Sequence, residues 1–202
     1  MALFDGKTKD IVKLFFELGQ LKRSKRTGWW LAKIEDPESV AEHSHRVAAL
    51  AYVLAKMEKS PKAKEIALAA LFHDALETRL VDVHKVHSNY LKTPKDVERR
   101  IVADQRALMP KDAADELNAI DASFGPVERA ILKDADYLEM AFQGKEYYDT
   151  GYHCAVDWIE NVGAVLKTKS AKRLWSEMRK TDSGIWFKGL KESIESIKKH
   201  NY

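Results

Sequence analysis

Three segments of the sequence place a histidine or an aspartate on a helix face that is otherwise apolar. His43 is the first, because it lies one turn before Val47 and two turns before Leu50. A single histidine in such a stripe is more often a core residue with satisfied hydrogen bonds than a ligand. A ligand role for His43 therefore depends on what the other two segments contain.

The second segment carries His73, Asp74 and Glu77 within five positions of a stretch rich in alanine and leucine. A buried ionised carboxylate is costly unless an opposite charge compensates it. No lysine or arginine occurs between Lys64 and Arg79, so the sequence offers no nearby side chain for that purpose. A divalent cation would supply the missing charge, and His73 would add a nitrogen ligand.

The third segment places Asp136 on one face with Leu132 and Met140, at spacings of four, whereas Lys133 and Asp134 fall off that face. Asp136 is therefore the predicted inward carboxylate. Two histidines and two aspartates form a mixed nitrogen and oxygen set. Such a set suits one Mn²⁺, Co²⁺, Fe²⁺, Ni²⁺ or Zn²⁺ ion better than Ca²⁺, and Mg²⁺ stays an alternative.

The composition is that of a globular protein with its own core. The chain has 202 residues, of which 45% are hydrophobic and 32% charged, and a net charge of +3. Acidic and basic residues interleave, so we expect no nucleic-acid polymer as a partner. No 18 apolar residues follow one another and no signal peptide appears, so we expect no membrane partner and a cytoplasmic protein. The single cysteine, Cys154, excludes an intramolecular disulfide and is predicted to be a buried packing residue.

Helical periodicity runs through the sequence, and no alternating strand pattern appears. A second helix should begin near Ser39, because Ser39 and Glu42 have the spacing of a capping box, and a third should begin at Ser60 and Pro61. The first helix is predicted from the apolar stripe Ile11, Leu14, Phe15, Leu18 and Leu21. The later helices are predicted at 62–77, 95–108, 111–121, 126–147, 153–167, 170–180 and 185–199.

We therefore predict an all-α fold in one domain over residues 1–202. The motif-bearing core covers about 8–150, and the C-terminal helices at about 151–202 pack on it. Tyr147 and Tyr148 are expected to pack a helix interface. Such aromatic side chains, with the C-terminal helices, favour a homodimer.

His43, the His73–Asp74 pair and Asp136 resemble the signature of the HD phosphohydrolase superfamily, in order and on helices. The segments 26–29, 37–44, 73–77 and 134–139 are similar to those of the HD-domain 5′-deoxynucleotidases. This resemblance implies an HD-type helical bundle. It also implies that a metal-activated water removes the 5′-phosphate of (deoxy)ribonucleoside monophosphates, so that the partner is a small nucleotide.

The resemblance implies a role for each matching residue. His43, His73, Asp74 and Asp136 match the metal ligands; Glu77 matches the carboxylate that positions or activates the water, Asp82 the acid near the sugar, Arg26 the phosphate-binding arginine, and Trp29 (or Trp30) the wall against the sugar. The chain departs from the family at Val81, where glycine is frequent, and at His84 and His87, where a plainer loop is expected.

Several alternatives stay open at this point. Trp29 could cap the core instead of contacting substrate, and Glu77 could neutralise Arg79 or complete a hydrogen bond to a metal ligand. His84 and His87 could bind a second ion, although a solvated loop is the stronger interpretation. The substrate could be a nucleoside triphosphate or a cyclic nucleotide. The chain could also be a non-catalytic helical module with a structural metal, although Glu77 and Arg26 argue against that.

Overall fold

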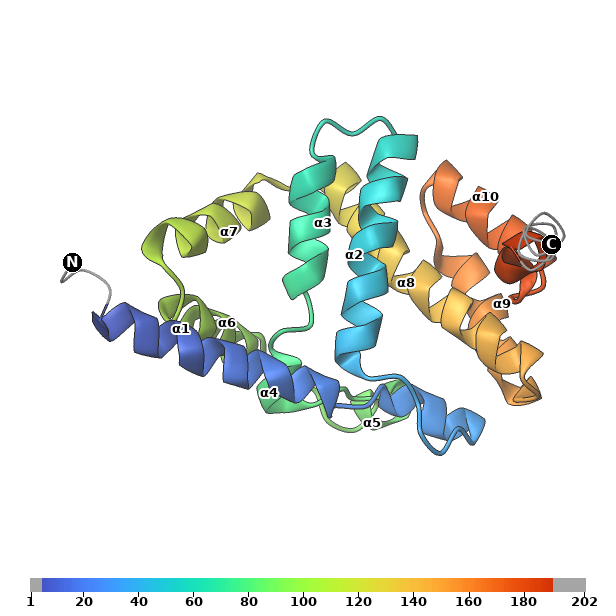
Figure 1. The fold of residues 1–202 in the computed structure, drawn as a ribbon, viewed down its shortest axis with the longest axis horizontal. Coiled ribbons are helices and arrows are strands. Elements are labelled where there is room, and N and C mark those ends of the chain that lie inside the picture. The colour runs from blue at the N-terminus through green and yellow to red at the C-terminus, as the bar shows by residue number, and fades with distance from the viewer. Residues whose placement is uncertain (1–4, 191–202) are drawn as a thin grey trace, which may run out of the picture.

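The computed structural model describes residues 5–190, and its ordered elements are helical (Figure 1). Within that range no β-strand forms, and Lys25 and Ser39 make an isolated antiparallel bridge. The elements are α1 (Asp5–Leu18), η1 (Gly19–Lys22), η2 (Thr27–Ala32), α2 (Val40–Met57), α3 (Ala63–Phe72), α4 (Glu77–Leu80), α5 (Lys85–Ser88), α6 (Lys95–Ala107), α7 (Lys111–Ser123), α8 (Pro126–Asp149), η3 (His153–Ala155), α9 (Val156–Val165) and α10 (Lys169–Met178). The predicted all-α class is confirmed.

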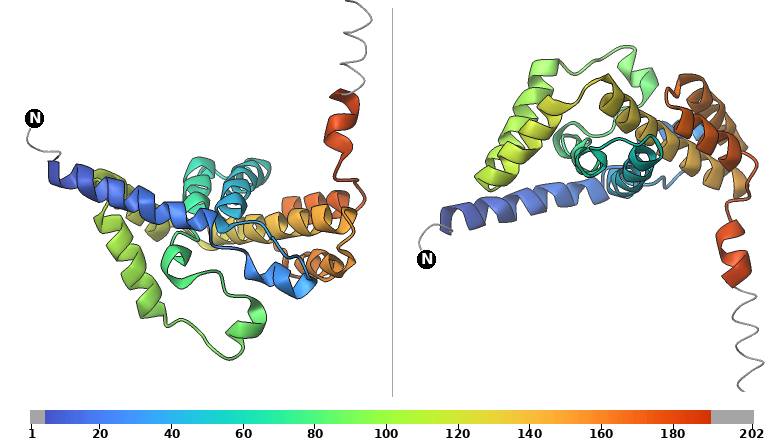
Figure 2. Two further views of the ribbon diagram at one scale, coloured as in Figure 1. Left: turned by 60° about the horizontal axis from the view of Figure 1, so that its bottom comes forward. Right: turned by 90° about the horizontal axis from the view of Figure 1, so that it is seen from above.

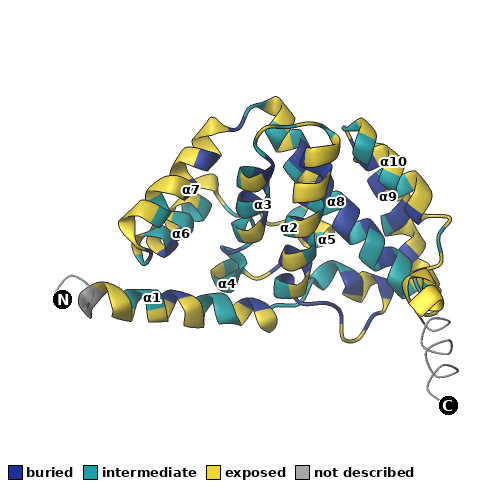
Figure 3. Cartoon of the chain, turned by 45° about the horizontal axis from the view of Figure 1, so that its top comes forward, coloured by how far each residue is buried: buried dark blue, intermediate teal, exposed yellow. Residues whose placement is uncertain are grey.

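The centre of the molecule is built from α2, α3 and α8. In Figure 1, α2 and α3 stand side by side and α8 passes behind them, in agreement with the contacts between these helices. Buried positions concentrate along α2 and α8, whereas α1 and α7 are mostly exposed or intermediate (Figure 3). The core includes Val47, Ala51, Leu54, Ile66, Ala70, Ile131, Ala135 and Leu138. This packing fixes the three helices relative to one another.

Helix α2 begins where the sequence predicts. The Glu42 N–H donates to Ser39 Oγ at 3.2 Å, and the Ser39 N–H donates to Glu42 Oε2 at 2.6 Å. These two bonds complete the predicted capping box, which satisfies two backbone donors that the first turn leaves free. Since His43 follows Glu42 directly, the cap also fixes the turn that carries this histidine.

Helix α3 is shorter than predicted at both ends. It begins at Ala63 with Lys62 as N-cap, and it ends at Phe72 instead of continuing to residue 77. Beyond Phe72 the bonds tighten, since the Ala75 N–H donates to the Phe72 carbonyl at 3.1 Å and the following amides repeat this i to i−3 pattern. Residues 73–76 therefore form a tight turn outside the α-helix.

Two side chains that the sequence predicts to be buried are exposed. Phe15 is 67% exposed, because α1 lies at the edge of the fold and buries only a narrow side around Leu14. Cys154 is exposed, since η3 precedes α9 and its buried position is taken by Ala155. The predicted continuous helix over 153–167 is thus divided into η3 and α9.

The helices after α8 pack back onto it. Both α9 and α10 contact α8. Residues 185–190 are helical and point away from the preceding helices (Figure 2), while the rest of the predicted helix at 185–199 lies outside the described residues. Among the described helices, none combines the length and the apolar character that crossing a membrane requires.

Candidate metal centre

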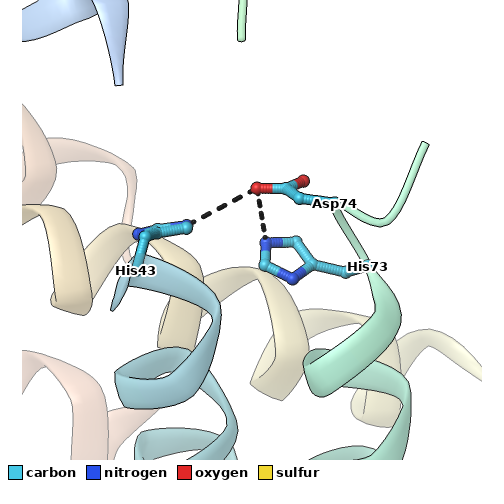
Figure 4. Close-up of side chains that lie close together, drawn as sticks. All are labelled: His43, His73 and Asp74. Atoms are coloured by element: carbon cyan, nitrogen blue, oxygen red, sulfur yellow. Dashed lines mark ion pairs between the residues drawn. The ribbon is translucent and has the colours of Figure 1, made fainter. Parts of the chain in front are cut away.

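Two histidines from different parts of the chain meet at one aspartate (Figure 4). His43 lies in the first turns of α2, and His73 with Asp74 forms the turn between α3 and α4. Asp74 Oδ2 is 3.1 Å from His73 Nε2 and 3.7 Å from His43 Nε2. The ligand atoms of these three residues all lie within 4.8 Å of one another. Because α3 ends at Phe72, the turn brings two adjacent side chains to the same point, which a continuous helix would hinder.

Hydrogen bonds determine which nitrogen of each ring faces this point. His43 Nδ1 donates to Glu139 Oε2 at 2.5 Å, and His73 Nδ1 donates to the Ala70 carbonyl at 2.6 Å. Each Nε2 atom is buried, and within the described part of the chain neither has a hydrogen-bond partner. Two imidazole Nε2 atoms thus converge on one carboxylate, a set of nitrogen and oxygen atoms that can bind a divalent cation.

The charges around His43 and Asp74 also shift the pKa values of these two residues. Burial disfavours a charged His43, yet the carboxylates of Asp136 and Glu139 outweigh burial and raise the pKa of His43 to about 9. Burial likewise opposes the charged form of Asp74, but the neighbouring His73 outweighs it and lowers the pKa of Asp74. Asp74 is therefore ionised at neutral pH, and its charge attracts a cation. The residues present fit one divalent cation.

Asp136 lies at the edge of the cluster. Its Oδ1 is 3.2 Å from His43 Nε2, while its Oδ2 accepts a hydrogen bond from Lys133 Nζ at 2.7 Å. Burial opposes its charge, but His43 and Lys133 outweigh burial and hold its pKa well below the usual range. Asp136 contacts the cluster through His43 and is not part of its tightest group.

Asp134 differs from the expectation that it would fall off the buried face. It is 1% exposed, because α8 is covered on more than one side. Its Oδ1 accepts the Lys167 N–H at 3.0 Å and its Oδ2 accepts the Thr168 N–H at 2.7 Å. Asp134 thus fastens the segment before α10 to α8, and Asp136 is the aspartate of this pair that reaches the histidines.

Glu77 faces the same cluster from the start of α4. Its Oε2 is buried and has no hydrogen-bond partner among the described residues. Burial and the nearby Asp74 and Asp82 raise the pKa of Glu77 to about 8. Arg79 pairs with Glu17 at 2.8 Å, so Glu77 is not needed to neutralise it. A carboxyl group with a raised pKa and a free oxygen is typical of a functional site.

Arg26 reaches the cluster from the loop before η2. Its NH1 is 2.8 Å from Asp82 Oδ1 and 3.6 Å from Asp74 Oδ2. Asp82 also accepts the Thr27 N–H at 2.6 Å, so both of its oxygens are engaged and hold the guanidinium in place. Val81, just before Asp82, has φ of +55° and ψ of 162°, a conformation that strains every residue except glycine.

Trp29 lies in the core. It is 2% exposed, and its Nε1 donates to Glu38 Oε1 at 2.9 Å. Its ring packs against Tyr147 and Trp158 at centroid distances of 5.1 and 5.4 Å. Of the two interpretations, this placement favours the core cap. The neighbouring Trp30 is 52% exposed and is the tryptophan that faces solvent.

His84 and His87 lie around the short helix α5. The His87 N–H donates to His84 Nδ1 at 3.2 Å, and the two ring centroids are 6.4 Å apart. Neither histidine belongs to a group of candidate metal ligands within residues 5–190. This geometry favours the solvated loop over a second ion site.

Glu139, Arg46 and Glu38 have a place near the site that the sequence alone does not predict. Glu139 is 0% exposed and bonds to both His43 and Arg46. Together with Glu38, His43 and Glu139 form a second group with metal-ligand chemistry. A signal was present, because Glu139 lies one turn after Asp136 and can face the same neighbouring helix.

Comparison with known proteins agrees with this geometry. A family model described as HD domain matches residues 18–178 of the chain. The chain belongs to the HD-domain family. The resemblance inferred from the His43, His73–Asp74 and Asp136 signature is thereby confirmed, and this HD-domain protein stands among the HD phosphohydrolases.

Individual relatives support the assignment. The human 5′-deoxynucleotidase HDDC2 is 30% identical over 152 residues, which are 73% of this chain and 74% of the human protein. The crystal structure of "genomics APC5600" has 34% sequence identity and a TM-score of 0.73, and the match covers 89% of this chain and 99% of that one. The cyanophage S-2L HD phosphohydrolase DatZ, solved with dA and one catalytic Zn²⁺ ion, shares the fold at a TM-score of 0.52 and 19% identity, over 82% of this chain and 96% of DatZ.

Proposed function

We propose that this HD-domain phosphohydrolase removes the 5′-phosphate of deoxyribonucleoside monophosphates, with one divalent cation held by His43, His73, Asp74 and Asp136. The observation that carries the proposal is the convergence of two buried, unpartnered Nε2 atoms on Asp74. The substrate class is supported by homology to HDDC2, a 5′-deoxynucleotidase that matches over most of both chains.

A bound divalent cation would supply Lewis-acid activation of the attacking water and of a phosphoryl oxygen. Arg26 lies 3.6 Å from Asp74, so its planar guanidinium can donate hydrogen bonds to the phosphate beside the ligand set. Glu77 has an unpartnered Oε2 at the same cluster and can orient the water or take its proton. Asp82 lies near the sugar in this proposal and orients Arg26 through their 2.8 Å hydrogen bond.

The test is phosphate release from a panel of deoxyribonucleoside and ribonucleoside monophosphates, nucleoside triphosphates and cyclic nucleotides. Each substrate is assayed with Mn²⁺, Co²⁺, Zn²⁺ and Mg²⁺, for the wild type, Asp74→Asn and the control Asp104→Asn. Asp104 is a suitable control because it is half exposed and pairs with Arg79 at the surface.

We expect the deoxyribonucleoside monophosphates to be the preferred substrates. Asp74→Asn should lower kcat/KM by more than about 100-fold, as is usual for the loss of a group that acts in the transition state. Asp104→Asn should retain the wild-type rate. Full activity of Asp74→Asn would reject the metal site, and a preference for triphosphates, cyclic nucleotides or ribonucleotides would reject the substrate class. The expected homodimer is checked separately by light scattering of the purified protein.

A further inference from the structure

We infer that Glu139 is a positioning residue, which holds His43 with Nδ1 protonated and Nε2 free for a cation. This inference rests on the metal site of the proposed function. Glu139 lies on α8 and His43 on α2, so the contact crosses the helix pair at the centre of the fold. In this inference Glu139 acts through His43, because its carboxylate faces Nδ1, on the side of the ring away from Nε2.

The imidazole of His43 has its two nitrogens facing different partners. Glu139 Oε2 lies 2.5 Å from His43 Nδ1, while His43 Nε2 on the other side of the ring lies 3.2 Å from Asp136 and 3.7 Å from Asp74. A carboxylate can only accept a hydrogen bond, so Nδ1 keeps its proton. A cation would therefore displace the proton of Nε2, the nitrogen that faces the other candidate ligands.

The carboxylate of Glu139 is itself held by a charged partner. This side chain is 0% exposed, and an ionised carboxylate at such a position needs a charged partner. Arg46, one turn after His43 on α2, provides it through a 2.9 Å bond from Nε to Glu139 Oε1. The two oxygens are thus divided between the histidine and the arginine, which orients the carboxylate plane.

The guanidinium of Arg46 is held by two further hydrogen bonds. Its NH1 donates to Glu146 Oε1 at 2.6 Å, and its NH2 donates to Gln143 Oε1 at 2.7 Å. Glu139, Gln143 and Glu146 all lie on α8, so one guanidinium spans two turns of that helix. A positioned arginine holds a positioned glutamate, and the glutamate in turn holds the ring of His43.

Glu139 could instead be only a structural link between α2 and α8. The substitution Glu139→Gln separates these roles, because glutamine keeps the shape and packing but removes the charge. Its amide can also donate to His43 Nδ1, which would place the proton on Nε2 and block that atom as a ligand. Glu146→Gln is the matched control, since Glu146 lies on the same helix and binds the same arginine without reaching His43.

The experiment is isothermal titration of the metal-free proteins with ZnCl₂, with thermal unfolding as a check on folding. Glu139→Gln should bind Zn²⁺ about 10- to 100-fold more weakly than the wild type, the usual effect of losing the partner of a ligating histidine. Glu146→Gln should stay within about twofold of the wild type, since the histidine keeps its partner. An unchanged Zn²⁺ affinity in folded Glu139→Gln would overturn the inference, and so would an equal loss in both variants.

A second measurement needs no variant. In the ¹⁵N spectrum of the Zn²⁺-loaded wild type, His43 should show a protonated Nδ1 and a metal-bound Nε2. The opposite assignment would overturn the inference even if Glu139→Gln failed to fold. Both readouts are independent of turnover. If no nucleotide released phosphate while Zn²⁺ bound normally, the proposed substrate class would be rejected, and the role of Glu139 would still be tested. A wild type that bound no Zn²⁺ would overturn both the proposed metal site and the role of Glu139.

Discussion

Replacing Asp134 by alanine should destabilise the fold without affecting the candidate metal centre. Asp134 and Asp136 are two residues apart on α8, but their carboxylates serve different neighbours. Asp134 accepts the backbone N–H groups of Lys167 and Thr168 at distances of 2.7 to 3.1 Å. Asp134→Ala removes the carboxylate that accepts hydrogen bonds from both of these backbone amides.

The size of the effect follows from these contacts. A hydrogen bond to a charged group contributes about 1.5–3 kcal/mol, so two amides set an upper range of about 3–6 kcal/mol. Lys167 is exposed, and water can replace part of the loss at its amide. We therefore expect the free energy of unfolding to fall by about 2–4 kcal/mol. For a chain of this length, that corresponds to a decrease in Tm of about 5–15 °C.

Urea unfolding of the metal-free proteins measures this difference, and Zn²⁺ titration of Asp134→Ala and Asp136→Asn separates the two roles. Asp136→Asn should also lose stability at pH 7, because the contacts of Asp136 with His43 and Lys133 hold its pKa below the usual range. Zn²⁺ affinity should fall in Asp136→Asn and stay unchanged in Asp134→Ala. A destabilisation below about 1 kcal/mol in Asp134→Ala, or a loss of Zn²⁺ binding in that variant, would refute the division of roles.

Three further predictions concern stability. Hydrogen bonds from Arg79 lower the pKa of Glu17 from 4.5 to about 2, so Glu17→Gln should be less stable than the wild type at pH 7, and chemical denaturation should show this difference disappearing as the pH falls from about 4.5 towards 2. Ser39→Ala should cost about 1 kcal/mol in urea unfolding through loss of the α2 cap, and an unchanged midpoint would contradict the capping role. Val81→Gly should raise the free energy of unfolding by about 1 kcal/mol, because glycine adopts φ of +55° without strain; a lower Tm would contradict this.

Periodicity and end signals predicted the elements that carry the candidate site. The Ser39 capping box located the start of α2, and the spacing of four around Asp136 selected the aspartate that reaches His43. Both signals are local, because caps and helix faces depend on residues within about one or two turns. The assignment of His43 to the buried face is confirmed by its 0% exposure.

The features that sequence reasoning missed depend on distant partners. The apolar character of the stretch after Phe72 predicts more helix, yet the backbone tightens there into the turn that carries Asp74. The burial of Asp134 depends on the segment before α10, and that of Glu139 depends on the arginine of α2. The apolar stripe of the first helix predicts a buried Phe15, yet only a narrower side of α1 is covered. Such pairings appear only when the helices are packed.

Helix α8 limits which insertions and deletions the protein can accept. Three acidic side chains of this helix point in different directions. Asp134 points toward the segment before α10, Asp136 toward the histidine cluster, and Glu139 toward Arg46. Deleting or inserting one residue of α8 before Asp134 would rotate all three side chains about the helix axis by about 100°. Natural relatives should therefore differ in length in the loops around α5 or after α8, and should keep the spacing from Asp134 to Glu139 unchanged.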